Sequence, residues 1–100
     1  HGHVAAFTAV PRNNLLLQSD GGSLRWFSGA ISAAGARRGF CARCGTSLFW
    51  DSPERETISI AAGTLEQPTG VRVGAHIYDS EAGDYYGLPD DGLPRFARGR

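Results

Sequence analysis

The chain contains no lysine, no methionine and only two cysteines, and its apolar runs are short. Ten arginines balance ten acidic residues, so the formal net charge is zero. A neutral chain lacks the basic surface that nucleic acids and anionic membranes attract, and we predict neither partner. No run approaches the roughly 20 apolar residues of a membrane helix, and the first residues do not read as a signal peptide. The default expectation is a cytoplasmic protein.

A length of 100 residues is that of one small domain with a modest core, so we expect a single domain over 1–100. Short β-forming runs, each bounded by Gly, Pro, Asn or Asp, predict strands at 4–10, 14–18, 23–29, 47–51, 57–63 and 71–79. Helical periodicity is absent and glycine is frequent, so the prediction is a mainly β fold with few or no long helices. From residue 80 onward, Gly, Pro and Asp predict a loop that wraps the domain.

The two cysteines, Cys41 and Cys44, lie in the segment "GFCARCGTSLFW". Cysteines three residues apart cannot join distant parts of a fold by a disulfide, so metal or redox chemistry explains them better. A tight turn in Cys-x-x-Cys-Gly brings both thiolates to one metal, and Gly45 supplies the positive φ that such a turn often needs. Backbone amides and Arg38 or Arg43 would lower the thiol pKa. We predict that Cys41 and Cys44 are zinc ligands.

Two other interpretations of the cysteines stay open, a redox dithiol and a pair of buried thiols. The redox interpretation is weaker because a thioredoxin-like motif begins a helix, whereas these cysteines lie between two apparent strands. A closed zinc site needs four ligands. The others must come from His1, His3, His76, a carboxylate, a second chain or residues absent from this sequence, and each histidine is more often a surface or strand-end residue.

The segments "RRGFCARCGTSLFW", "ISIAAGTLEQPTGVRVGAHIY" and "DGLPRF" closely resemble the glutathione-dependent formaldehyde-activating enzyme family, which is related to centromere protein V. The resemblance runs from His1 to Phe96 and covers the carboxyl-terminal two-thirds of the family's pattern. It implies a zinc-bearing, mainly β fold of the Mss4-like β-tent type, with Cys41 and Cys44 in the zinc knuckle.

Family members carry a Cys-x-Cys pair and a Cys-x-Cys-x-x-Cys cluster before the segment where this sequence begins. By resemblance, Cys41 and Cys44 complete a structural zinc site with the first pair, and the three-cysteine cluster is the proposed catalytic zinc site. Neither upstream motif is in this sequence, so we expect the missing ligands ahead of His1 and a second, catalytic Zn²⁺ only with them. Where relatives read Ser-Lys-Ala-Pro-Trp, this chain reads "SEAGDYY" with Glu81 at the lysine, so that loop's substrate contacts are not carried over.

The resemblance implies a zinc-dependent carbon–sulfur lyase that joins formaldehyde to glutathione and gives S-hydroxymethylglutathione, with a small thiol or aldehyde as substrate. His76 is the candidate proton carrier, although a strand histidine is more often packed. The alternative is a noncatalytic zinc-stabilised Mss4-like binding module. Its ligand groove would be lined by Trp26, Trp50, Tyr85 and Tyr86, which are otherwise core and rim aromatics.

Overall fold

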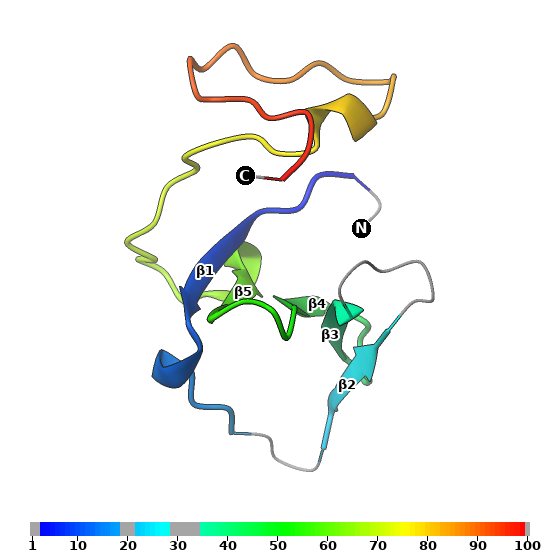
Figure 1. Ribbon diagram of the computed structural model, residues 1–100, viewed down its shortest axis with the longest axis vertical. Helices are drawn as coiled ribbons and strands as arrows, with labels where there is room; N and C mark the ends of the chain where they lie inside the picture. The colour runs from blue at the N-terminus through cyan, green and yellow to red at the C-terminus, as the bar shows by residue number, and fades with distance from the viewer. Residues whose placement is uncertain (1–2, 19–21, 29–34, 100) are drawn as a thin grey trace. The chain divides into compact units, whose positions relative to one another are not determined.

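The computed structural model describes residues 3–18, 22–28 and 35–99 (Figure 1). The chain divides into two compact units, His1–Thr69 and Gly70–Arg100. Each unit has its own hydrogen bonds and is described by itself. The single domain expected over 1–100 stays a prediction.

The first unit is a five-stranded antiparallel sheet with the strand order β1-β5-β4-β3-β2. Strands β2 to β5 follow one another as neighbours, and β1 adds to the far side of β5. The strands are β1 (Phe7–Pro11), β2 (Leu24–Phe27), β3 (Arg37–Cys41), β4 (Ser47–Asp51) and β5 (Thr57–Ala61). The helices among the described residues are short 3₁₀ turns, η1 (Arg12–Asn14), η3 (Ala62–Thr64) and η4 (Asp79–Glu81). The prediction of a mainly β fold is confirmed.

Two of the predicted strands are wrong. After η1, residues 15–18 have no regular structure, and Leu16 is 80% exposed. The segment 71–79 contributes only an isolated parallel bridge between His76 and Arg95. A β-forming sequence becomes a strand only when a neighbouring strand satisfies its backbone groups, and neither segment has such a neighbour among the described residues.

Strand β3 is a strand that the sequence pattern missed, because Gly39 interrupts its apolar residues and weakens the strand signal. Its backbone pairs Gly39 with Trp26 on β2 and with Phe49 on β4. A Cβ atom at Gly39 would lie 3.0 Å from the Trp26 ring and 3.1 Å from the Phe49 ring. Glycine therefore lets these two rings stack across β3, with their centroids 6.0 Å apart.

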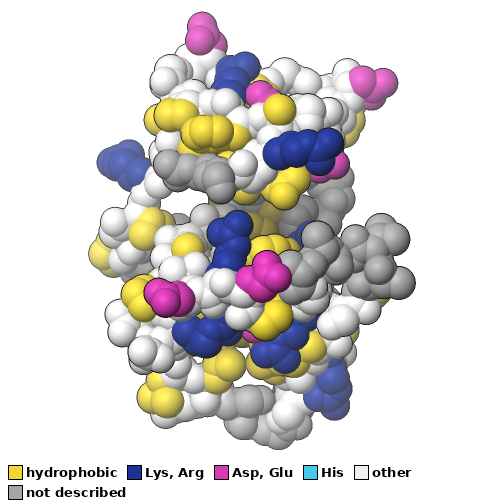
Figure 2. All heavy atoms as spheres, in the orientation of Figure 1, with side chains coloured by type: hydrophobic (Ala, Val, Ile, Leu, Met, Phe, Trp, Pro, Cys, Tyr) yellow, Lys and Arg dark blue, Asp and Glu magenta, His cyan; other side chains and the backbone are white. Residues whose placement is uncertain are grey.

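The apolar core of the sheet unit is small. Ile58 on β5 is 4% exposed, and Ala36, just before β3, is also buried. Large exposed side chains of this unit include Leu16 and Phe27. Figure 2 shows hydrophobic side chains interspersed with arginines and acidic residues on the visible face. A core of this size leaves the unit dependent on hydrogen bonds and ion pairs.

The second unit is held mainly by backbone hydrogen bonds between His76 and the segment around residue 95. The His76 amide donates to the Pro94 carbonyl at 2.9 Å, and the Phe96 amide donates to the His76 carbonyl at 2.8 Å. The irregular chain predicted from residue 80 is confirmed apart from the end of η4, whereas its wrapping of the domain stays a prediction. In the part of the chain that the structure describes, no helix has the length and apolarity to cross a bilayer.

Candidate functional site

The cysteine pair lies where β3 turns toward β4. Cys41 is the last residue of β3, and Cys44 lies in the turn that follows. The Gly45 amide donates to the Cys41 carbonyl at 2.7 Å, and the Cys41 amide donates to the Thr46 carbonyl at 2.9 Å. Gly45 has φ of 78°, which confirms the predicted left-handed conformation. A Cβ atom at Gly45 would meet nothing within 4 Å, so the backbone alone requires glycine there.

The two thiols are free, with Cys41 half-buried and Cys44 exposed. The Cys44 Sγ lies 3.0 Å from the Thr46 Oγ1. Hydrogen bonds from the Thr46 side chain, then from its backbone, and then from the Cys41 thiol lower the pKa of Cys44. The expected influence of Arg38 and Arg43 is not among these causes. The turn thus favours the thiolate form that binds metals.

The donor set of the turn fits half of a zinc site. Two thiols on one Cys-x-x-Cys turn are a common pair of tetrahedral zinc ligands. Within residues 3–18, 22–28 and 35–99, no group of three His, Cys, Asp or Glu residues could hold a metal ion. The candidate ligand His3 is exposed, His76 contacts Asp91, and His1 lies outside the described residues.

A hollow of about 260 Å³ borders the half-buried cysteine. Its lining consists mostly of apolar side chains and includes one amide and one hydroxyl side chain. The residues are Leu17, Gln18, Ser23, Leu24, Cys41, Leu48 and Phe49. Sequence reasoning missed this hollow because it placed residues 14–18 in a strand, and the hollow forms where that segment lies beside β2, β3 and β4.

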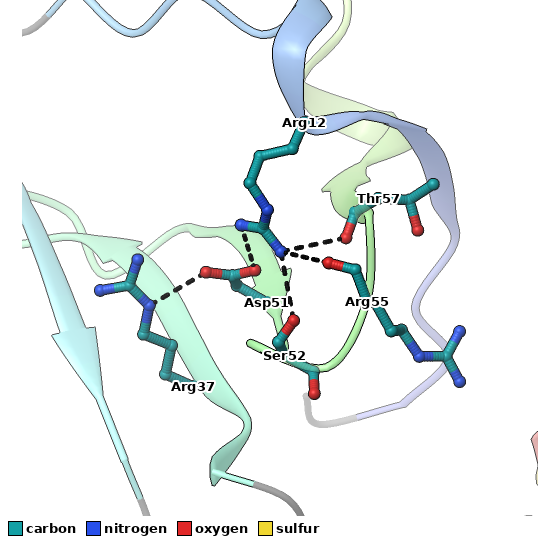
Figure 3. A network of polar contacts seen from close by, with 6 residues as sticks. All are labelled: Arg12, Arg37, Asp51, Ser52, Arg55 and Thr57. Carbon is teal, nitrogen blue, oxygen red and sulfur yellow. Dashed lines mark hydrogen bonds and ion pairs between the residues drawn. The ribbon is translucent and has the colours of Figure 1, made fainter.

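Asp51, at the end of β4, is the centre of an ionic network that ties three parts of the sheet unit together (Figure 3). Its side chain is 5% exposed, and its Oδ1 lies 2.7 Å from Arg12 Nη1. Its Oδ2 accepts a hydrogen bond from Arg37 Nε at 3.1 Å. Arg12 Nη2 also donates to the carbonyls of Ser52 at 3.1 Å and Arg55 at 2.9 Å.

Two opposing effects set the ionisation of Asp51. Burial raises its pKa, but hydrogen bonds and charge from Arg12 and Arg37 outweigh burial, and the pKa is lowered overall. The carboxylate is therefore ionised at neutral pH. The one sequence signal for a special role of Asp51 is its position directly after an apolar run. Its two arginine partners could not be found from the sequence, because they lie 39 and 14 residues away along the chain.

The two tryptophans among the four aromatic residues proposed to line a groove do not lie on one face of the sheet. Trp26 stacks with Phe49, and the Arg37 guanidinium carbon lies 3.8 Å from the Trp26 ring centroid. Trp26 is paired with Gly39 and Trp50 with Arg38, so the two tryptophans lie on opposite faces of the sheet. Tyr85 and Tyr86 belong to the other unit, where their ring centroids are 4.8 Å apart.

His76 forms a polar pair within the second unit. Its Nε2 lies 2.9 Å from the Asp91 Oδ2, and the other Asp91 oxygen accepts a hydrogen bond from the Leu93 amide at 3.0 Å. The hydrogen bond with His76, followed by that from Leu93, lowers the pKa of Asp91. Asp91 thereby orients the imidazole, and a role for His76 as proton carrier stays a prediction.

The sequence model of one protein family, described as glutathione-dependent formaldehyde-activating enzyme, matches residues 1–81. The matched range includes Cys41, Cys44, all five strands and the first residues of the second unit. No curated protein and no solved structure matches the chain.

Proposed function

Since the chain belongs to the glutathione-dependent formaldehyde-activating enzyme family, we propose that it acts as a zinc-dependent carbon–sulfur lyase. The reaction joins formaldehyde to glutathione and forms S-hydroxymethylglutathione. The observation that supports this function is the turn holding Cys41 and Cys44, in which hydrogen bonds from Thr46 lower the pKa of Cys44. The two thiolates supply two of the four ligands of a structural zinc site.

The other ligands of this site, and those of an open catalytic zinc site, come from outside the described residues. A zinc ion in an open site supplies Lewis-acid chemistry, which stabilises charge on an aldehyde oxygen. The backbone hydrogen bonds of the turn between β3 and β4 and the positive φ of Gly45 support the ligand assignment, because they bring Cys41 and Cys44 into one turn. We place the protein in the cytoplasm, where thiols such as Cys41 and Cys44 stay reduced.

The test measures S-hydroxymethylglutathione formation by full-length protein against the uncatalysed rate, together with zinc content by mass spectrometry. We expect turnover above the uncatalysed rate, and loss of zinc and activity in the Cys41→Ser/Cys44→Ser variant. Ala42→Ser is the matched control, because it adds a hydroxyl group to the same exposed turn without removing a thiol. Turnover absent from zinc-loaded wild-type protein contradicts the lyase function, and unchanged zinc content in the double variant contradicts the ligand assignment.

A noncatalytic zinc-stabilised binding module is the second candidate. The backbone hydrogen bonds that close the turn around Cys41 and Gly45 suit a structural zinc, which needs no open coordination position. The same experiment separates the two functions. A module binds zinc through Cys41 and Cys44 and gives no turnover above the uncatalysed rate.

A further inference from the structure

Arg37 is held in place by two different contacts while the outer edge of its guanidinium stays open. Its Nε donates to the Asp51 Oδ2 at 3.1 Å, and its Cζ lies 3.8 Å above the Trp26 ring. Figure 3 shows Nε facing Asp51 and one terminal nitrogen on the far side of the guanidinium, pointing away from Asp51. The two terminal nitrogens make no hydrogen bond to the residues that the structure describes, and the side chain is 43% exposed. Arg37 therefore presents two N–H donors in a fixed direction.

The charges around Arg37 favour an anion at this open edge. Asp51 carries one negative charge, and it is shared between Arg37 and Arg12. Two positive charges against one negative charge leave the cluster with a net charge of +1. Because Asp51 is buried and also held by Arg12, the guanidinium of Arg37 loses little freedom when it binds a ligand. A planar guanidinium edge matches a carboxylate, which it binds through two parallel hydrogen bonds.

The same face of β3 leads from Arg37 to the cysteine turn. Side chains alternate along a strand, so Arg37, Gly39 and Cys41 share one face, and four residues of strand span about 13 Å. Between the two ends, Gly39 leaves room for the stacked rings of Trp26 and Phe49. At the far end, Cys41 borders the apolar hollow. The face thus has a cationic end, an aromatic floor and a thiol end.

We propose that Arg37 binds a carboxylate of a short peptidic thiol whose chain lies along this face toward Cys41. An extended tripeptide spans roughly 10 to 11 Å, so from Arg37 it reaches most of the way along the about 13 Å to Cys41. The proposal rests on the proposed function, because glutathione is a tripeptide thiol with two carboxylates. Arg37 acts as a binding and specificity-determining residue, and Asp51 and Trp26 position it.

The test compares glutathione with its monoethyl and diethyl esters, in which one or both carboxylates are blocked. Full-length, zinc-loaded protein is titrated with each compound in the absence of formaldehyde, and NMR follows the Arg37 Nε–H and Trp26 indole N–H signals. Because the hydrogen bonds between Arg37 and a carboxylate are charge-assisted, we expect esterification of that carboxylate to weaken binding roughly tenfold or more. In Arg37→Met the affinity for glutathione should fall by a similar factor, and the esters should then bind this variant as tightly as glutathione does.

Arg38→Met is the matched control, because Arg38 is the next residue on β3, lies on the opposite face and is exposed. It removes the same charge and should leave the affinity for glutathione unchanged. Arg37→Lys keeps a positive charge without the planar fork, so we expect an affinity between those of wild type and Arg37→Met. The ester comparison on wild-type protein needs no variant, so it holds even where Arg37→Met fails to fold.

Several results would overturn the proposal. These are equal affinity for glutathione and both esters, equal losses in Arg37→Met and Arg38→Met, or no detectable binding of glutathione. Equal signal shifts from acetate at the same concentration would show a general anion contact in place of a peptide site. The lyase function is judged separately. Ester-sensitive binding without turnover supports the role of Arg37 and contradicts the lyase function. Turnover without ester-sensitive binding supports the lyase function and contradicts the role of Arg37.

Discussion

Each of the two units contains a carboxylate held by polar partners, but the two carboxylates differ in burial and in the partners that hold them. In the sheet unit, Asp51 is 5% exposed and paired with two arginines. In the second unit, Asp91 is 32% exposed and paired with His76 and the Leu93 amide. The sheet brings together segments such as β1 and β5, about 50 residues apart, whereas the Asp91 contacts join residues at most 15 apart.

This difference shows how burial changes the energetic role of one chemical group. A buried carboxylate must keep its partners, since an unpaired charge in a poorly solvated position is costly. An exposed carboxylate can exchange its partner for water at little cost. The described residues 70–99 are all half-buried or exposed, so a substitution in the second unit should have a local effect. The matching substitution in the sheet unit should disturb that whole unit.

The largest effect that would test this comparison is loss of the proposed zinc. A structural zinc contributes on the order of 10 kcal/mol to folding in small domains. Treating the zinc-loaded, full-length protein with a chelator should abolish amide protection in β3 and β4, because Cys41 is the last residue of β3 and Cys44 lies between the two strands. Hydrogen exchange should change less at the His76 and Phe96 amides. Undiminished protection in β3 and β4 after metal removal would contradict a structural zinc.

Removal of the Asp51 carboxylate should have the next largest effect. Asp51→Ala leaves Arg12 and Arg37 without their shared partner. We expect a loss of about 3 kcal/mol in the free energy of unfolding, at the low end for a broken buried pair because both arginines are partly exposed. Chemical denaturation measures it, with Asp91→Ala as the matched control. Equal losses in the two variants would remove the distinction between the units.

Acid should weaken the sheet unit through the same carboxylate. The pKa of Asp51 is lower in the folded protein than its ordinary value, because Arg12 and Arg37 outweigh its burial. Its stabilisation is therefore present above about pH 4 and is lost as the pH falls through the folded-state pKa. Denaturation of wild type and Asp51→Ala between pH 7 and pH 2 should show the two stabilities converging. A difference that stays constant over this range would argue against an ionic role.

Gly45→Val should cost roughly 1 to 3 kcal/mol, because valine is strained at a positive φ. The cost comes from the backbone, since a Cβ atom at Gly45 meets nothing within 4 Å. Gly74→Val in the second unit is the control, because a Cβ atom at Gly74 would also meet nothing within 4 Å and Gly74 has no positive φ. Thermal denaturation compares the two variants, and equal losses would show that the φ at Gly45 is unimportant.

The smallest effect is expected from Asp91→Asn. This change removes the charge beside His76 and keeps a group that can still accept a hydrogen bond from the Leu93 amide. Exchange at the His76 and Phe96 amides should quicken slightly, and the amides of β3 and β4 should keep their protection. Loss of protection across the sheet would show that the two units unfold together.

The sequence alone was sufficient for features that depend on neighbours along the chain. The β-forming runs at 47–51 and 57–63 predicted β4 and β5 at the right places, within two residues. The Cys-x-x-Cys-Gly spacing predicted a tight turn and the positive φ of Gly45. The motifs around Cys41 and Cys44 also indicated the family. Periodicity and turn chemistry act over a few residues, so they can be read without knowing the fold.

Other features were decided by tertiary structure, because they depend on residues far apart in the chain. Strand β3 exists despite Gly39 because β2 and β4 pair with it and place Trp26 and Phe49 on either side of the glycine. The segment at 14–18 has suitable residues, but no strand among the described residues pairs with it. Asp51 becomes a buried, ionised carboxylate only when strand pairing brings two distant arginines to it, since burial alone would raise its pKa.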